Sequence, residues 1–442
     1  MVEAAGGARH REPESNIHRP GEDVAWSAVG LAVQARRERY ARAMTIDYGP
    51  PRDDDELRAY LAVGFQSLVG APLPTEAGWF DSWKARTLPY GRARVARRDG
   101  QVAAGLLDLD LGQFFGGRSV AMGGVSFVVT APEHRDRKVA GAMMRAYVRE
   151  LYDRKGAPIS ALFPATQPLY RSAGFETAGW FARQRVVTSA IRERAGALRV
   201  RRVEPRDDDA IRALYASRAK TSNGMLDRSP WCWARIFEPS RGGPAHAYVV
   251  EGEANVEGYV SLTQKPLDGP IGYALDALDM QASTERAHRA LLALLGGHRS
   301  LVPHVIFRSA PNDPFLALLD EQPAPPDQRL DWMLRVVDVP RAMAARGWPR
   351  GVKVDLHFDV VDELVAENAG AWRVRISGGE AHAARGGDGA IRVDVRALAC
   401  LYTGYLSPFE LRRIGKLRAD DAAVDALAEA FAGSAPWMCE MF

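Results

Sequence analysis

The chain has 442 residues, of which 47% are hydrophobic and 9% aromatic, so it is long enough for about two to four domains with well-filled cores. Its 58 basic and 55 acidic residues leave a formal net charge of +3, and no basic segment is interleaved with aromatic residues, which argues against nucleic-acid binding. No segment approaches about 18 uncharged apolar residues, and the N-terminus has no apolar signal-peptide core, so neither membrane insertion nor export is expected.

A flexible N-terminal extension is expected over residues 1–44, which are rich in charged residues, glycine and alanine. The first folded unit is expected over residues 45–195. Its hydrophobic pattern predicts a helix at 54–68, strands at 93–96, 101–107 and 125–130, and a helix that begins near residue 139.

The second unit, expected over residues 196–338, repeats this order of elements. The pattern predicts a helix at 207–219, strands at 246–251, 256–263 and 273–280, a helix at 284–295 and a last strand at 329–336. Residues 278–289 replace the strand-to-helix turn of the first unit and place no small residues where the helix begins. We therefore expect a second copy of the same fold that does not bind a cofactor.

A third, smaller unit is expected over residues 339–442. Strands are predicted at 352–360, 372–377, 381–384 and 390–395, and helices at 395–403, 407–414 and 422–431. The chain ends with the apolar, aromatic segment 436–442. Because chain ends are generally polar and loose, this composition indicates a tail that packs into a groove.

The turn that follows the strand at 125–130 is the most informative segment. It is basic and leads into a helix that begins with small residues: Arg135, Arg137, Lys138, Ala140, Gly141 and Ala142. Small residues let a ligand approach the unpaired N–H groups of the first helical turn, where the helix dipole and the basic side chains favour an anion. The pattern predicts a site for the pyrophosphate of a nucleotide-bearing cofactor, and the alternative is an ordinary basic turn in solvent.

A second segment contains the sequence Leu169-Tyr170-Arg171-Ser172-Ala173-Gly174-Phe175. Together with the basic turn, it resembles the GCN5-related N-acetyltransferase (GNAT) superfamily. In that superfamily an Arg/Gln-x-x-Gly-x-Gly/Ala turn holds the coenzyme A pyrophosphate, and a tyrosine on a following short helix lies beside the thioester sulfur. Here the turn reads Arg135-Asp136-Arg137-Lys138-Val139-Ala140, with lysine where glycine is usual. A lysine there is disfavoured if the position needs a positive φ and costs little if the backbone is helical.

The whole arrangement resembles the Eis (enhanced intracellular survival) family of actinobacterial N-acetyltransferases. This resemblance spans nearly all of the chain after the extension. It implies an α/β fold of two tandem GNAT folds, the first catalytic and the second degenerate, followed by a sterol-carrier-protein-like domain. It also implies acetyl-CoA as donor, a small-molecule amine as acceptor, and a homohexamer built as a trimer of dimers.

The resemblance also assigns site residues. The pantetheine arm would pair with the main chain of Val128, Val129 and Thr130. The remaining cofactor contacts would come from the helix entrance and from the segment before the short helix: Asp136, Arg137, Lys138, Val139, Ala140, Gly141, Ala165 and Thr166. Tyr170 matches the general acid, and the α-carboxylate of Phe442 matches the general base. Without the surrounding motif, Tyr170 would be interpreted as a tyrosine packed at a helix start.

No metal site is predicted, because the nine histidines show no paired ligand spacing. Cys232, Cys400 and Cys439 are too far apart for a metal knuckle or a disulfide framework, which favours reduced thiols in a cytoplasmic protein.

The acceptor is expected to be an aminoglycoside-like or other amine-bearing natural product. In the family the acceptor pocket is wide and acidic, and here the pocket walls would come from carboxylates and aromatic rings: Glu76, Asp81, Glu440, Trp79, Phe80 and Trp83. These residues are equally compatible with solvated carboxylates beside core aromatics. Two other functions stay open, an acyltransferase with a longer acyl donor and a scaffold without catalytic activity whose third unit binds lipid or protein.

Overall fold

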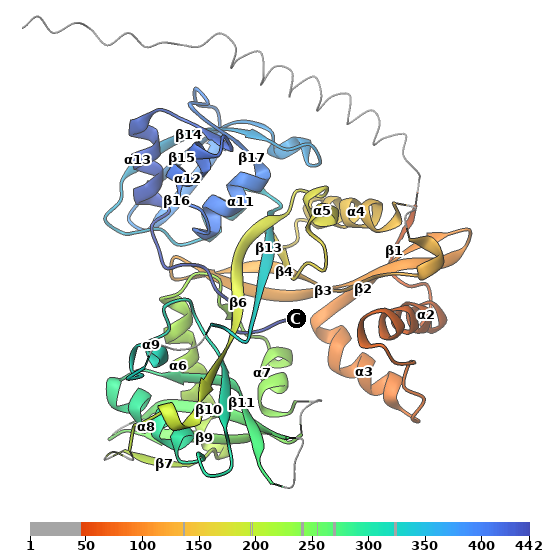
Figure 1. The fold of residues 1–442 in the computed structure, drawn as a ribbon. Helices are drawn as coiled ribbons and strands as arrows, with labels where there is room; N and C mark the ends of the chain where they lie inside the picture. The colour runs from red at the N-terminus through yellow and green to blue at the C-terminus, as the bar shows by residue number, and fades with distance from the viewer. Residues whose placement is uncertain are drawn as a thin grey trace, which may run out of the picture. The chain divides into compact units, whose positions relative to one another are not determined.

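The computed structural model describes residues 46–442 except 136–137, 195, 197, 240–242, 254, 268–270 and 322–324. The expected N-terminal extension therefore lies outside the described residues. Within them, every helix and strand that the hydrophobic pattern predicts is present in the predicted order, with further elements between them (Figure 1). No described helix is both long and apolar enough to cross a membrane.

The first part of the chain is an antiparallel run of strands that ends in one parallel pair. Its strands are β1 (Asp47–Gly49), β2 (Gly91–Arg98), β3 (Gln101–Phe115), β4 (Arg118–Thr130) and β5 (Ile159–Leu162). β4 and β5 are parallel, so a crossover must join them, and helix α4 (Val139–Asp153) supplies it. The buried face of α4 includes Val139, Met143 and Tyr147, as their spacing predicts.

Helix α2 (Asp54–Gly64) follows β1. The Asp53 carboxylate caps it by accepting from the Glu56 N–H at 2.9 Å. The predicted helix extended to residue 68, and the chain does continue, but as a π-helical turn over Phe65–Val69. Helix α3 (Trp79–Thr87) follows before β2.

Two strands, β6 (Glu176–Val187) and β13 (Gln328–Val336), each pair with a strand of the other part, and we call them the exchanged strands. β6 leaves the first part and pairs with β12 (His304–Arg308) of the second. β13, the last strand of the second part, returns and lies between β5 and β6. One sheet of 13 strands consequently runs through both parts.

The second part contains all the elements that its pattern predicts. They are α6 (Asp208–Lys220), β9 (His246–Glu251), β10 (Val256–Pro266), β11 (Tyr273–Ala282), α8 (Glu285–Gly296) and, as the last strand, β13. The pattern did not predict the strands β7 (Arg199–Arg202) and β12, the short strand β8 (Leu226–Asp227), which pairs with β3, or the helices α7 (Pro230–Phe237) and α9 (Pro314–Ala317).

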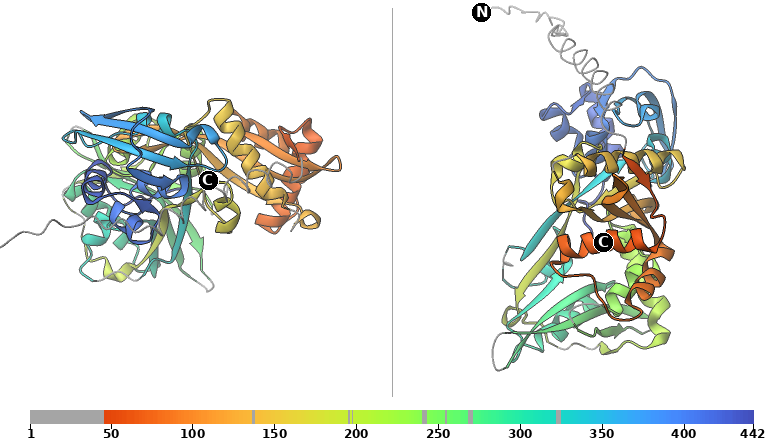
Figure 2. Two further views of the ribbon diagram at one scale, coloured as in Figure 1. Left: turned by 90° about the horizontal axis from the view of Figure 1, so that it is seen from above. Right: turned by 90° about the vertical axis from the view of Figure 1, so that its right-hand side faces the viewer.

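The third part is a separate five-stranded sheet with helices beside it (Figure 2). Its elements are β14 (Val354–Val361), β15 (Gly370–Ser377), β16 (Glu380–Arg385), β17 (Ile391–Asp394), β18 (Leu417–Arg418), α11 (Val395–Thr403), α12 (Pro408–Arg413) and α13 (Asp421–Ala430). A short helix, α10 (Val339–Ala345), precedes this sheet and was not predicted.

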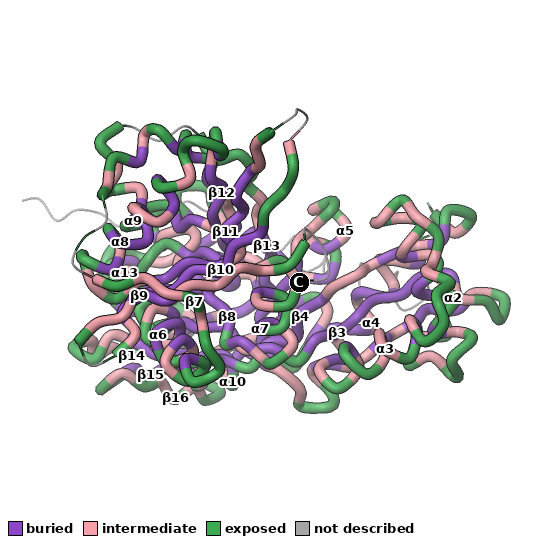
Figure 3. The backbone as a smooth tube through the Cα atoms, turned by 90° about the horizontal axis from the view of Figure 1, so that it is seen from below, coloured by how far each residue is buried: buried purple, intermediate pink, exposed green. Residues whose placement is uncertain are grey.

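One apolar core joins the third part to the exchanged strands. Leu109 of β3, Leu334 of β13 and Leu398 of α11 belong to the same buried cluster. Figure 3 shows the large sheet as mostly buried, with exposed residues concentrated in its connections. The third part of the chain therefore shields the exchanged strands from solvent.

A buried ion pair lies at this junction. The Arg335 guanidinium of β13 is fully buried and donates to the Asp362 carboxylate at 2.6 Å. Gly174, at φ 84°, packs directly on it, and a Cβ atom there would lie 2.3 Å from Arg335 Nη1. Glycine is required at this position both by the backbone conformation and by the close approach.

We expect Asp362→Asn to lower the free energy of unfolding by about 3–5 kcal/mol, because it leaves the buried Arg335 cation without its counter-ion. Urea unfolding at neutral pH measures the loss. The matched control is Asp421→Asn, whose partner Arg412 forms an exposed pair, with side chains 92% and 39% accessible. That control should lose less than about 1 kcal/mol. Equal, small losses in the two variants would contradict the expected role of the buried pair.

Candidate active site

β4 and β5 separate part of the way along the sheet. They pair only from Met122 opposite Ile159 to Val125 opposite Leu162. Just beyond, Phe127 adopts a positive φ of 50°, and the register between β3 and β4 shifts. Such a bulge bends the strand that carries it. In the described chain, residues 128–130 therefore have no strand partner on the side of β5.

Tyr60 of α2 holds this bulge. Its hydroxyl donates to the Phe127 carbonyl at 3.0 Å, and its ring meets the Phe127 ring edge-on with centroids 5.8 Å apart. Tyr60 is completely buried, so this contact is part of the core. The main chain of Val128, Val129 and Thr130 is thereby fixed in an extended form with one edge available for hydrogen bonds.

Helix α4 begins beside this open edge. Lys138 precedes it in the left-handed conformation, at φ 60° and ψ 11°, and the first helical hydrogen bond runs from Ala142 N to Lys138 O at 3.1 Å. The N–H groups of Val139, Ala140 and Gly141 thus have no carbonyl partner within the helix, and no side chain of the described residues caps the helix start. The two residues before Lys138, Asp136 and Arg137, lie outside the described residues.

The backbone conformation of Lys138 shows whether this position needs a positive φ, which the sequence left open. The backbone there does need a positive φ, which is why glycine is usual at this point in the resembled motif. A residue with a Cβ atom adopts this conformation at a cost of about 1–2 kcal/mol. The fold imposes the same turn on lysine and so places a cationic side chain at the helix start.

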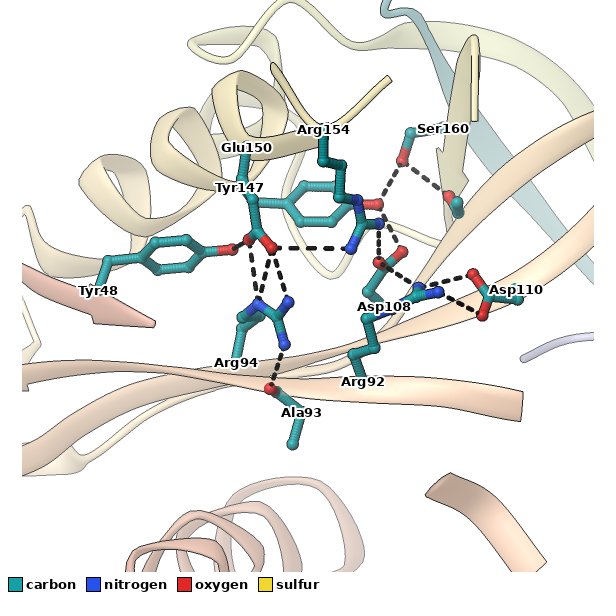
Figure 4. Close-up of polar contacts among 11 residues, drawn as sticks. Tyr48, Arg92, Ala93, Arg94, Asp108, Asp110, Tyr147, Glu150, Arg154 and Ser160 are labelled. Carbon is teal, nitrogen blue, oxygen red and sulfur yellow. Dashed lines mark hydrogen bonds and ion pairs between the residues drawn. The ribbon is translucent and has the colours of Figure 1, made fainter. Parts of the chain in front are cut away.

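A network of polar side chains around the buried Asp108 and Tyr147 fixes α4 on the sheet (Figure 4). The Asp108 carboxylate of β3 accepts from Tyr147 at 2.9 Å and from Arg154 at 2.5 Å, and Arg92 lies 3.4 Å away. Burial raises the pKa of Asp108, while the hydrogen bonds from Arg154 and Tyr147 oppose that shift.

The other side of α4 is held in the same way. Glu150 forms a hydrogen bond with Tyr48 at 2.6 Å and an ion pair with Arg94 at 2.6 Å. Because both networks connect α4 to neighbouring strands, the N-terminal turn of the helix has a fixed position relative to β4.

Tyr170 lies on the short helix α5 (Gln167–Arg171), which packs beside α4. Its side chain is 4% exposed and meets the Phe175 ring edge-on. Burial raises the pKa of Tyr170 to about 12, so the phenol keeps its proton at neutral pH. Ala165 and Thr166 are exposed in the segment between β5 and α5.

The C-terminal tail returns to β6. Trp437 forms a parallel bridge with Trp180, and Met438 N donates to Trp180 O at 3.0 Å. Beyond this bridge, the Phe442 ring lies edge-on to Phe163, with centroids 5.8 Å apart. A Cβ atom on Gly124 of β4 would lie 3.1 Å from the Phe442 ring. The last residue of the chain therefore packs against β4 and the end of β5, close to the point where they separate.

Two arginines of the second part anchor the tail. Arg228 is almost completely buried, forms ion pairs with Asp279 at 2.5 Å and with Glu440, and lies over the Tyr215 ring at 3.6 Å. Arg235 donates to the Met441 carbonyl at 2.8 Å. Neither arginine was predicted from the sequence, because no spacing motif connects them to a tail some 200 residues later.

A pocket of about 320 Å³ lies beside Phe442. It is bounded by the tail, by β6 and α7, and by β10, β11 and β12. Glu440 lines it, but Glu76 and Asp81 do not and are exposed near α3. Phe80 packs in the core beneath Arg58. The expected acidic wall of Glu76, Asp81 and the neighbouring aromatics is therefore not part of this pocket.

Among the residues that the structure describes, no group of three or more His, Cys, Asp or Glu side chains is arranged to hold a metal ion. The three cysteines are buried and free.

Comparison with known families agrees with the fold. Residues 54–178 and residues 224–336 each match a family described as an acetyltransferase (GNAT) domain. Residues 339–439 match the sterol carrier protein domain. These matches, with the two sheets described above, confirm the predicted fold class of two GNAT folds followed by a sterol-carrier-like domain.

Relatives match over most of the chain. An uncharacterized N-acetyltransferase of Streptomyces coelicolor is 31% identical over 343 residues, which cover 73% of this chain and 81% of that protein. The N-acetyltransferase Eis of Mycobacterium tuberculosis is 28% identical over 424 residues, which cover 89% of this chain and 98% of that protein.

Solved structures show the same architecture. A GCN5-related N-acetyltransferase from Anabaena variabilis has a TM-score of 0.82 and 31% identity, and the match covers 90% of this chain and all (100%) of that one. Eis1 from Mycobacterium abscessus has a TM-score of 0.71 at 22% identity, which supports the fold alone, with the same coverage of 90% and 100%.

We expect Lys138→Gly to stabilise the protein by up to about 1 kcal/mol, because glycine adopts the left-handed conformation without steric cost. Chemical denaturation measures the change. Lys155→Gly is the matched control, since Lys155 also has a positive φ of 53° and lies at the other end of α4. A loss of stability in Lys138→Gly beside a gain in Lys155→Gly would show that the Lys138 side chain itself stabilises the turn.

Proposed function

This chain belongs to the Eis family of GCN5-related N-acetyltransferases, and from that premise we propose that it transfers the acetyl group of acetyl-CoA to a primary amine of a small molecule. The acceptor class includes aminoglycoside-like compounds and other amine-bearing natural products. The observation that carries the proposal is the position of Phe442, which packs against Gly124 and Phe163 where β4 and β5 separate. A carboxylate held there is available to an amine that approaches the gap between the strands.

The proposed donor site is formed by the two features beside that gap. The free edge of Val128, Val129 and Thr130 suits the amides of a pantetheine arm, which pair with main-chain groups as a strand would. The unpaired N–H groups of Val139, Ala140 and Gly141, with the cation of Lys138, suit a pyrophosphate. Asp136, Arg137, Ala165 and Thr166 complete the proposed set by resemblance to the family.

The proposed chemistry divides two proton transfers between two groups. An amine must be neutral to attack a thioester, and the α-carboxylate of Phe442 accepts the proton that the amine loses. The acetyl C–S bond breaks as the C–N bond forms, and the Tyr170 phenol donates its proton to the departing thiolate. Since burial keeps the pKa of Tyr170 near 12, the phenol is protonated whenever the donor is bound near neutral pH.

Several finer points rest on the family resemblance. We infer a homohexamer built as a trimer of dimers, which the mass in solution by light scattering tests. Three reduced cysteines agree with a cytoplasmic enzyme. Acetylation of an aminoglycoside-like antibiotic would give resistance. Competition between acetyl-CoA and longer acyl-CoA donors separates the proposal from an acyltransferase of another donor class.

We expect Tyr170→Phe to lower kcat by about 10²–10⁴-fold, the range for a positioned acid-base group, while the Kd for acetyl-CoA stays unchanged. Steady-state rates and isothermal titration measure the two quantities. The control is Tyr152→Phe, a tyrosine in the last turn of α4, away from the helix start that is proposed to bind the donor. This variant should keep the wild-type kcat. In the wild type, the raised pKa of Tyr170 predicts no fall in kcat from its ionisation between about pH 7 and pH 10. Full turnover of Tyr170→Phe across that range would reject the general-acid role.

We expect one glycine appended after Phe442 to abolish turnover, because it moves the carboxylate away from the position that the Phe442 ring fixes. Acetyl-CoA binding and the melting temperature should stay unchanged, since the anchors at Trp437 and Glu440 are untouched. Phe442→Ala is the complementary variant, which keeps a terminal carboxylate but loses the packing, and should retain part of the activity. If the extended protein turned over at the wild-type rate, the tail would be structural and the base would lie elsewhere.

A further inference from the structure

The pocket beside Phe442 is lined by more basic than acidic side chains. The basic ones are Arg183, Arg235, Lys265 and Arg308, and the acidic ones are Asp276 and Glu440. The resemblance to the Eis family predicts an acidic acceptor pocket, which would suit a polycation. The charge of this pocket therefore bears directly on which amine enters it.

Three of the four cations converge on one carboxylate. Arg183 and Lys265 each lie 2.9 Å from Asp276 Oδ2, and Arg308 lies 2.5 Å from Asp276 Oδ1. Burial favours the neutral form of Asp276, but Arg308, Lys265 and Arg183 outweigh it and lower its pKa, so the carboxylate is ionised at neutral pH. One negative charge then faces three positive charges.

The strand register places two of these three positive charges next to each other. Arg183 of β6 lies directly opposite Arg308 of β12 in an antiparallel pair. Like charges in that position repel each other and destabilise a sheet unless an anion lies between them. Asp276 supplies one such anion, and the buried Nε of Arg183 has no hydrogen-bond partner in the described structure. The three cations of this wall therefore keep two positive charges that Asp276 does not neutralise.

The remaining charges of the pocket do not cancel the excess. Glu440 is paired with the buried Arg228, which also pairs with Asp279. Arg235 donates to the neutral carbonyl of Met441. Because Asp279 already neutralises Arg228, Glu440 leaves one net negative charge beside the pocket, and the α-carboxylate of Phe442 adds a second. Arg235 offsets one of the two, so the three cations around Asp276 still leave the pocket with a net positive charge.

We propose that the acceptor carries an anionic group, a carboxylate or a phosphate, in addition to the amine that is acetylated. The anion would meet Arg183, Lys265 and Arg308, and the amine would meet the α-carboxylate of Phe442. This inference rests on the proposed N-acetyl transfer and narrows its substrate class. A molecule with several ammonium groups would bring further positive charge against the same wall. The volume of about 320 Å³, at the small end of the range for ligand pockets, also favours a small acceptor.

The test compares acceptors of similar length that differ in the group at the end away from the amine. ω-Amino carboxylates with three to six methylene groups are assayed by thiol release beside the matching primary amides, α,ω-diamines and ω-aminoalkyl phosphonates. We expect the carboxylate or the phosphonate to exceed the amide in kcat/KM by about tenfold or more, as one charge-assisted hydrogen-bonded contact provides, and the diamine to be the poorest acceptor. The carboxylate and phosphonate arms show which anion fits. Equal rates for acid and amide, or a preference for the diamine, would overturn the inference and leave the proposed function standing.

The variant Lys265→Gln tests whether the cations around Asp276 cause the preference for an anionic acceptor. Its side chain is 48% exposed, so its removal threatens the fold less than removal of Arg183 or Arg308. We expect the ratio of kcat/KM for the amino acid to that for its amide to fall by about tenfold. Lys353→Gln, on an exposed lysine of the third part, should keep the wild-type ratio. An unchanged ratio in Lys265→Gln would contradict the assignment.

A binding measurement separates the two proposals. If acetyl-CoA binds but no amine of the series is acetylated, the proposed transfer fails for this substrate class. The charge inference is then decided by isothermal titration with 5-aminopentanoate. We expect measurable binding that weakens about tenfold in Lys265→Gln, and no binding, or equal binding by the two proteins, would overturn it.

Discussion

Strand β6 is the element on which the positions of the other functional parts depend. It pairs with β13 on one side and with β12 on the other, so it belongs to both halves of the large sheet. Trp180 of β6 receives the C-terminal tail, and Arg183 of β6 lies in the pocket wall. Because backbone hydrogen bonds fix strand register to within one residue, the tail, the pocket and the gap between β4 and β5 are held in one rigid relation.

The tail is held by charge as well as by strand pairing. Arg228 sits among aromatic rings and would be costly to bury alone, but Asp279 and Glu440 both neutralise it. Such a cluster adds little net stability compared with an apolar core. Its effect is to allow only one position for Glu440, and therefore for Phe442 two residues later. A tail held by apolar contacts alone could slide, whereas one that must meet a buried cation has a fixed register.

The start of α4 shows a second balance between local cost and tertiary support. Lys138 adopts a conformation that glycine adopts more easily, and the fold tolerates it because Asp108 and Glu150 tie α4 to the strands beneath. The conformational cost is about 1–2 kcal/mol, smaller than what several charge-assisted hydrogen bonds contribute together. The turn is thus kept in shape by residues remote from it in sequence, and it accommodates a residue other than glycine.

The sequence by itself determined the longer helices and strands and the family of this protein. Periodicity placed α6, α8, the hairpin of β9 and β10, and the strands and helices of the third part within a few residues, because the burial of one face repeats locally along the chain. The turn at residues 135–140 and the segment around Tyr170 indicated the GNAT fold, since their residues act within one loop and one helix. They did not reveal whether Lys138 has a positive φ, because that depends on how α4 is fixed to the sheet. Only the tertiary structure decided that β13 lies between β5 and β6, that Arg228 anchors Glu440, and that Arg183, Lys265 and Arg308 share Asp276. These contacts join residues tens to hundreds of positions apart. An ion pair between such distant residues produces no repeating pattern in a single sequence, so it cannot be predicted from one.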